Sequence, residues 1–259
     1  MDRIKALLLI LAVVFMLSAS ISTTTVAAGT PSPKFPVSGT PQGANTSGAA
    51  LSVKDRLTAD LQQIGLALQN YHDVNGHFPP AYVAGANGTP LFSWRVLLLP
   101  YLGQQALFDQ FDTSKAWNDR ANRAVLQQMP DVFRGPLAPR RSIFTHYAGV
   151  AGPSTMFDCV QARATGTACV GTRRADITDG PSNTVAVGEV AQALIPWTMP
   201  EDVDIRAHPT LGERGGFSGV LADGVPFAFA DGSVRFLPNS TPADVLHAYF
   251  TINGGEVIP

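Results

Sequence analysis

Two Asp-Gly pairs are the first candidates for chemistry in this sequence. They are Asp223-Gly224 and Asp231-Gly232, in the stretch LADGVPFAFADGSVRFL. Loop carboxylates can hold Ca²⁺ or act as general acids and bases. Asp-Gly between alternating apolar residues is also a strong signal for a tight hairpin turn, because both residue types tolerate positive φ angles.

Read as two-residue turns, the two pairs give hairpin registers that agree with each other. They place one set of side chains on the same face of a three-stranded meander: Val220, Ala222, Val225, Phe227, Phe229, Val234 and Phe236. Pro226 disagrees, because proline has no N–H to donate to a strand ladder. We therefore expect both pairs to be turn residues with no catalytic or cofactor-binding role. Calcium binding stays open as the weaker alternative, because the Asp-rich loop with a trailing Glu that is typical of calcium sites is missing.

Other residue types that could support an enzyme are scattered along the chain. Glu189 and Glu201-Asp202 could form the carboxylate pair that glycoside hydrolysis needs. The sequence has five histidines: His72, His77, His146, His208 and His247. No two of them have the His-x-x-x-His spacing of a zinc hydrolase. An enzyme should bring at least two of Glu189, His146 and Glu201 to one cavity; we expect instead that the protein is not an enzyme.

Cys159 and Cys169 are the only two cysteines, with nine residues between them. Two thiolates alone cannot complete a tetrahedral zinc shell, and an even pair at short range in an exported chain is typical of a disulfide. We predict a local disulfide here.

The N-terminus has the pattern of an export signal. Arg3 and Lys5 precede an apolar run that ends in small polar residues, and the small side chains of Val26 and Ala28 suit cleavage after Ala28. We expect a signal peptide over 1–28, with an uncleaved membrane anchor as the alternative. The Gly-, Pro-, Ser- and Thr-rich stretch 29–50 is predicted to be a flexible linker. The protein is then periplasmic or extracellular, or is anchored to the membrane through this N-terminal segment.

Composition and periodicity define the elements that position these residues. The chain has 259 residues, of which 45% are hydrophobic and 15% charged, and its formal net charge of −2 excludes an electrostatic footprint for nucleic acid. An apolar stripe of Leu57, Leu61, Ile64, Leu68 and Tyr71 predicts an amphipathic helix over 52–73, and we expect this stripe to pack on the aromatic face of the meander. Short helices should follow, and after Pro136 short apolar runs alternate with turns, as in an antiparallel sheet. We predict an α+β domain over 51–259.

Five separated segments together resemble the bacterial domain of unknown function 1559, a family of prepilin-type proteins with an H-x9-DG motif. In chain order they are LQQIGLALQNYHDVNGHFPPAY, SWRVLLLPYLGQQALFDQFDTSKAWND, ITDGPSNTVAVGE, WTMPEDVD and FADGSVRFL. The resemblance implies a pseudopilin-like fold, in which a long N-terminal helix packs on an antiparallel sheet with helical and loop insertions. It also implies a link to type II secretion or pilus-like assembly.

The sequence departs from that family at two places. A conventional signal and linker stand where the family has a prepilin leader, so fibre assembly through an apolar half-helix is not expected. Leu221 occupies the position of the motif histidine, ten residues before Asp231. We expect an exported, non-catalytic structural or interaction protein of the cell envelope, with envelope or secretion components as partners. The alternatives are an extracytoplasmic module that binds carbohydrate or peptide, and an uncharacterised hydrolase.

Overall fold

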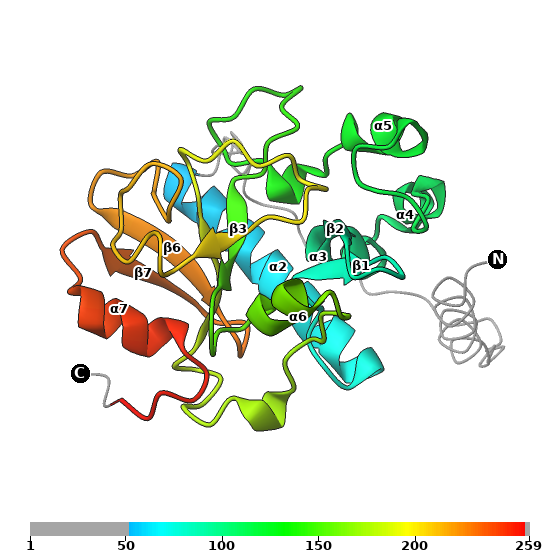
Figure 1. The fold of residues 1–259 in the computed structure, drawn as a ribbon. Helices are drawn as coiled ribbons and strands as arrows, with labels where there is room; N and C mark the ends of the chain where they lie inside the picture. The colour runs from blue at the N-terminus through cyan, green and yellow to red at the C-terminus, as the bar shows by residue number, and fades with distance from the viewer. Residues whose placement is uncertain (1–51, 257–259) are drawn as a thin grey trace, which may run out of the picture. The chain divides into compact units, whose positions relative to one another are not determined.

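The computed structural model describes residues 52–256, so the predicted signal peptide and linker lie outside the described part. Its helices are α2 (Val53–Asn75), α3 (Trp94–Leu97), α4 (Gln105–Gln110), α5 (Arg123–Leu126), α6 (Val160–Thr165) and α7 (Ala243–Phe250). Its strands are β1 (Tyr82–Ala84), β2 (Pro90–Ser93), β3 (Tyr147–Ala151), β4 (Val185–Glu189), β5 (Val203–Asp204), β6 (Gly224–Phe229) and β7 (Val234–Pro238). The predicted α+β class is confirmed (Figure 1).

Helix α2 follows the predicted apolar stripe. The side chain of Ser52 accepts a hydrogen bond from the backbone of Asp55, whose carboxylate bonds back to Ser52, so a capping box begins the helix. Gly76 ends it in the left-handed conformation, at φ 77°. Four positions of the stripe are buried: Leu57, Leu61, Ile64 and Leu68. The predicted helix is confirmed, and it runs two residues beyond the expected end.

Five strands form the main sheet in the order β5-β3-β4-β6-β7, and β1 and β2 form a separate two-stranded sheet. Strand β5 lies parallel to β3, while the other neighbours in the main sheet are antiparallel. The two faces of the main sheet are covered by different helices, with α2 behind the strands and α7 in front in Figure 1. The long helix therefore packs on the sheet, as expected.

The hairpin at Asp231-Gly232 forms, but its predicted register is wrong by one residue. The backbone N–H of Phe229 bonds to the carbonyl of Ser233 at 2.8 Å, which leaves a three-residue loop over 230–232 instead of a two-residue turn. Gly232 completes this loop at φ 86°. As a result Phe227 lies opposite Arg235, and Phe236 lies opposite Pro226 on the other face of the sheet.

This shift also corrects the expected partner of the aromatic face. The ring of Phe227 contacts Phe217 and Phe250 at centroid distances of 5.2 and 5.8 Å, and Phe250 belongs to α7. Helix α2 lies on the opposite face, where the ammonium of Lys54 sits 5.1 Å from the ring of Phe236. The aromatic face thus receives α7, not the stripe of α2 as predicted.

The first predicted hairpin, at Asp223-Gly224, does not form. Strand β6 begins at Gly224 and has no strand immediately before it, so the three-stranded meander is wrong. The reason is that β6 pairs with β4 on one side and with β7 on the other, so no edge of β6 remains for a preceding strand. The carbonyl of Glu189 in β4 instead accepts from the backbone N–H of Ser218, at 3.0 Å, and the chain before β6 runs beside β4 there.

Helix α2 meets the hairpin loop at a backbone-to-backbone contact. A Cβ added to Gly65 would lie 3.1 Å from the Cα of Gly232, so a side chain at position 65 would crowd the loop, while the φ of 86° at position 232 favours glycine there. One turn further along α2, the amide of Gln69 donates to the carbonyl of Ala230. The loop of the second hairpin is therefore fixed against the helix.

Candidate functional site

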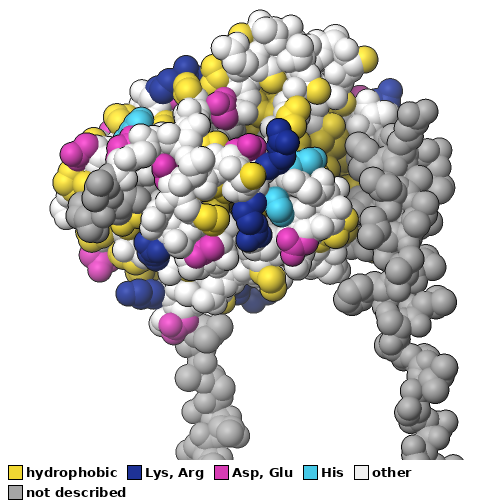
Figure 2. Space-filling model, turned by 90° about the horizontal axis from the view of Figure 1, so that it is seen from below, with side chains coloured by type: hydrophobic (Ala, Val, Ile, Leu, Met, Phe, Trp, Pro, Cys, Tyr) yellow, Lys and Arg dark blue, Asp and Glu magenta, His cyan; other side chains and the backbone are white. Residues whose placement is uncertain are grey.

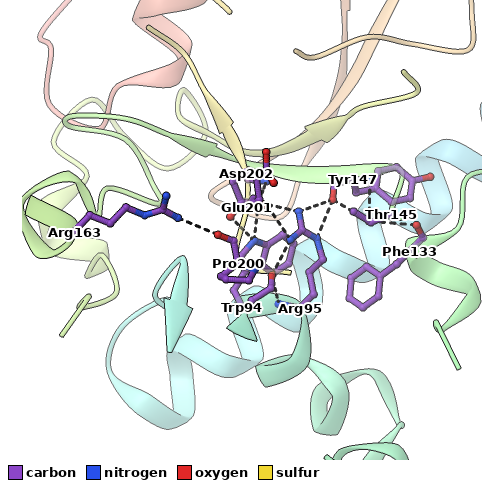
Figure 3. Close-up of polar contacts among 11 residues, drawn as sticks. Trp94, Arg95, Phe133, Thr145, Tyr147, Arg163, Pro200, Glu201 and Asp202 are labelled. Atoms are coloured by element: carbon purple, nitrogen blue, oxygen red, sulfur yellow. Dashed lines mark hydrogen bonds and ion pairs between the residues drawn. The ribbon is translucent and has the colours of Figure 1, made fainter. Parts of the chain in front are cut away.

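Arg95 is fully buried, with 0% of its side chain exposed. It lies in the short helix α3, which begins after the N-cap Ser93. Its guanidinium donates to the hydroxyl of Ser93 at 2.7 Å, to the carbonyl of Tyr147 at 2.9 and 3.0 Å, and to Asp202 at 2.8 Å (Figure 3). Burial lowers the pKa of Arg95, and the Asp202 carboxylate opposes that shift.

Asp202 completes this buried network, which we call the Arg95 cluster (Ser93, Trp94, Arg95, Tyr147 and Asp202). Its side chain is 3% exposed and accepts from the indole of Trp94 at 3.0 Å and from the backbone N–H of Gly149 at 2.7 Å. The cluster ties α3, β3 and the segment before β5 together. It neutralises its own charges, which is the condition for keeping an ion pair away from water.

A cleft of about 400 Å³ opens beside the cluster, between α6 and the segment Pro200–Arg206. Six of its lining side chains could contact a ligand: Tyr82, Phe157, Arg163, Glu201, Asp204 and Arg206. Figure 3 shows Arg163 reaching from α6 toward Pro200, whose carbonyl accepts from its guanidinium at 3.0 Å. A second pocket, of about 350 Å³, shares Glu201, Asp202 and Asp204 with this cleft.

The disulfide between Cys159 and Cys169 is present, so the predicted pairing is confirmed. It closes the loop that carries α6, which is one wall of the cleft. Disulfides persist in oxidising compartments, and the bond accords with an exported protein. Within residues 52–256, no helix combines the length and apolar character needed to cross a lipid bilayer.

The candidate catalytic residues from the sequence do not meet in one cavity. Glu201 borders both pockets, whereas neither lining includes Glu189 or His146. Glu189 is fully buried in β4 and accepts from the backbone N–H of Val220 at 3.2 Å. Burial lowers the pKa of His146. The expectation that the protein is not an enzyme stays a prediction.

The two Asp-Gly pairs lie at turns. A carboxylate oxygen of Asp231 accepts from the backbone N–H of Ser233 at 2.8 Å, inside the hairpin loop. Asp223 lies just before β6, where its carbonyl accepts from the backbone N–H of Asn239 at 3.3 Å. In the part of the chain that the structure describes, no group of three or more His, Cys, Asp or Glu could hold a metal ion. Calcium binding stays the weaker alternative to a turn role for these residues.

Sequence reasoning missed a second buried group, at the interface of α2 with the sheet. We call it the Asp60–Glu189 group (Asp60, Tyr147 and Glu189). Asp60 pairs with Arg56 at 2.8 Å and accepts from the hydroxyl of Tyr147 at 3.2 Å. Tyr147 lies opposite Glu189 in the ladder between β3 and β4. Burial raises the pKa of Asp60 to about 6 and that of Glu189 to about 7.

The charges on one face of the molecule do not form a patch of a single sign. On the face drawn in Figure 2, basic and acidic side chains are interspersed. This agrees with the net charge of −2 and favours recognition by individual groups over long-range steering.

Comparison with known proteins gives a family but no characterised relative. The family described as "Protein of unknown function (DUF1559)" matches residues 58–207, which is more than half of the chain. No curated protein matches the chain, and no solved structure does.

Proposed function

Because the chain belongs to the DUF1559 family of proteins of unknown function, we propose that it is an exported, non-catalytic interaction protein of the cell envelope. The proposal includes a pseudopilin-like role, in which α2 on its sheet contacts envelope proteins or components of secretion or pilus-like assembly. The helix-on-sheet arrangement and the disulfide support it.

One observation carries the proposal: the outer face of α2 is neutral. Between Arg56 and Asp73, the only Asp, Glu, Lys or Arg is Asp60, which is 4% exposed. The exposed positions along this stretch are Ala59, Gln62, Gln63, Leu66 and Asn70. The solvent face of a surface helix normally carries charges, and contact surfaces are depleted in them. Leu66 is 60% exposed and lies in the middle of this face.

The contact surface can be tested by photo-crosslinking in living cells. A photoreactive residue at position 66 should capture an envelope protein that mass spectrometry identifies. Leu137 is a matched control, because it is 64% exposed and lies outside α2. The same residue at position 137 should not capture that protein. Equal capture from both positions, or none from 66, would contradict the proposal.

The purified partner then allows a quantitative test. A charge placed in an apolar contact must be desolvated, so Leu66→Glu should weaken binding about tenfold or more. Leu137→Glu should leave the dissociation constant unchanged. Circular dichroism of both variants checks that the fold is intact.

Export is tested separately, through the mature N-terminus. Mass spectrometry of the protein recovered from cells should find a chain that starts at Gly29. A chain that retains Met1 would overturn cleavage and favour the anchored form.

A further inference from the structure

The cleft between α6 and Pro200–Arg206 combines charges of both signs with apolar surface. Its volume of about 400 Å³ falls in the range of small-molecule sites. Tyr82 and Phe157 line it and are 1% and 2% exposed, and Phe157 stacks on Trp94 at a centroid distance of 5.1 Å. The rings belong to a packed core, so one side of the cleft is rigid.

Most of the charges at the cleft already have partners inside the protein. Asp202 is neutralised by Arg95. Arg206 forms a two-pronged pair with Asp204, at 3.0 and 2.6 Å, and this pair holds the pKa of Asp204 below its ordinary value. The charges of these two ion pairs cancel, so together they offer a ligand no net charge.

Three polar groups at the cleft are not part of these ion pairs: the Glu201 carboxylate, the Arg163 guanidinium and the Tyr82 hydroxyl. Within residues 52–256, Glu201 has no hydrogen bond or ion pair through its carboxylate. The guanidinium of Arg163 donates one hydrogen bond, to the carbonyl of Pro200, and lies 5.2 Å from the centroid of the Tyr82 ring, but it has no carboxylate partner among these residues. The hydroxyl of Tyr82 is buried and has no partner in this part of the chain. A buried hydroxyl without a partner is costly, and a ligand atom would remove that cost.

In the described part of the chain, a guanidinium without a carboxylate partner, a carboxylate without a cationic partner and a buried hydroxyl are complementary to a small zwitterion. We propose that this cleft binds a free amino acid or a short peptide. Arg163 takes the ligand carboxylate, for which a guanidinium fork is suited, and Glu201 takes the ammonium. The apolar part of the ligand lies along the side chains of Val160 and Ala164, which also line the cleft. A neutral sugar fits less well, because it would leave both charged side chains without a counter-charge.

The disulfide gives this site its second rigid wall. Cys159 lies directly before α6, and its bond to Cys169 fixes the helix that carries Arg163. The site is separate from the outer face of α2, so this inference does not rest on the proposed function.

The test is calorimetric titration of the full chain, with its disulfide formed, against four ligands. Trialanine offers both termini, while N-acetyl-trialanine and trialanine amide each lack one charge, and maltotriose is a neutral sugar of similar size. We expect trialanine to bind, and each blocked peptide to bind about tenfold more weakly or worse. Maltotriose should not bind measurably.

Single variants assign each end of the ligand. Arg163→Gln should weaken trialanine about tenfold but should not weaken trialanine amide further, because the carboxylate is already missing. Glu201→Gln should behave in the same way toward N-acetyl-trialanine. Arg173→Gln is the matched control: its side chain is 72% exposed and lies outside the cleft lining, so binding should not change.

Three results would overturn the inference. They are the absence of trialanine binding, equal binding of blocked and free peptides, and tight binding of maltotriose that Arg163→Gln does not affect. The last result would assign the cleft to a carbohydrate. Circular dichroism of each variant shows that a loss of binding is not a loss of fold.

Discussion

The Arg95 cluster and the Asp60–Glu189 group are both buried, but their carboxylates differ in how many hydrogen bonds they accept. In the cluster, Asp202 is bonded to Arg95, to an indole N–H and to a backbone N–H. In the group, one carboxylate oxygen of Glu189 has no hydrogen bond within the described residues. The cluster is therefore a hydrogen-bonded ion pair, whereas burial raises the pKa of the two acids in the group, to about 6 for Asp60 and about 7 for Glu189.

Tyr147 belongs to both. Its carbonyl accepts from Arg95, and its hydroxyl donates to Asp60. The backbone carbonyl of Tyr147 contributes to the cluster and its side chain contributes to the group. A substitution of the side chain therefore tests the group and leaves the carbonyl bond of the cluster in place.

Removal of Arg95 should have the largest effect. Arg95→Met leaves Asp202 buried without a counter-ion, and we expect a loss of about 3–5 kcal/mol in the free energy of unfolding. Urea denaturation at neutral pH measures it. Arg173→Gln, an exposed arginine, should change stability by less than about 0.5 kcal/mol. A similar small change for Arg95→Met would show that the cluster is not needed for stability.

Glu189 should make stability depend on pH. Its folded pKa of about 7 lies above the ordinary value of 4.5, so the folded state holds this proton more tightly than the unfolded chain does. Its contribution is fully present below pH 4.5 and is lost as the pH rises through 7.

The matching variant is Glu189→Gln, which cannot ionise. Between pH 5 and pH 8 it should lose about 2 kcal/mol less of its unfolding free energy than the natural chain does. Urea unfolding at a series of pH values gives both profiles. Parallel profiles would mean that Glu189 does not titrate in this range.

Tyr147→Phe should have the smallest effect, about 1 kcal/mol. It removes the hydroxyl that favours the ionised form of Asp60, while the carbonyl that serves Arg95 remains. The pKa of Asp60 should therefore rise above about 6. Carboxyl NMR titration can follow it, and an unchanged or lower pKa would contradict the bond between these side chains.

Local sequence patterns predicted the helices and strands better than they predicted how these elements pair and pack with one another. The stripe from Leu57 to Leu68 predicted α2 because helical periodicity is a property of the segment itself. The sequence signal at Asp231-Gly232 correctly predicted a hairpin. It could not choose between two- and three-residue loops, since Asp and Gly suit both. In the folded chain the three-residue loop contacts α2, which is remote in sequence.

The buried charges were harder to predict. Arg95 and Asp202 are 107 residues apart, and no local pattern relates them. Asp60 did carry a signal: it lies three residues after Leu57 and four before Ile64, within the apolar stripe, although its residue type suggested the polar face. Glu201 was singled out as a catalytic candidate, and the structure places it at a cleft with a different set of neighbours.

The contact between Gly65 and Gly232 has a consequence for how this domain can vary. The two backbones approach closely without side chains between them. A methyl group at position 65 would require the helix or the Gly232 backbone to shift by a few tenths of an ångström. A shift of the helix would also move Asp60 and the neutral outer face of α2. The hairpin loop therefore limits how closely α2 can pack, although the two segments are far apart in the sequence.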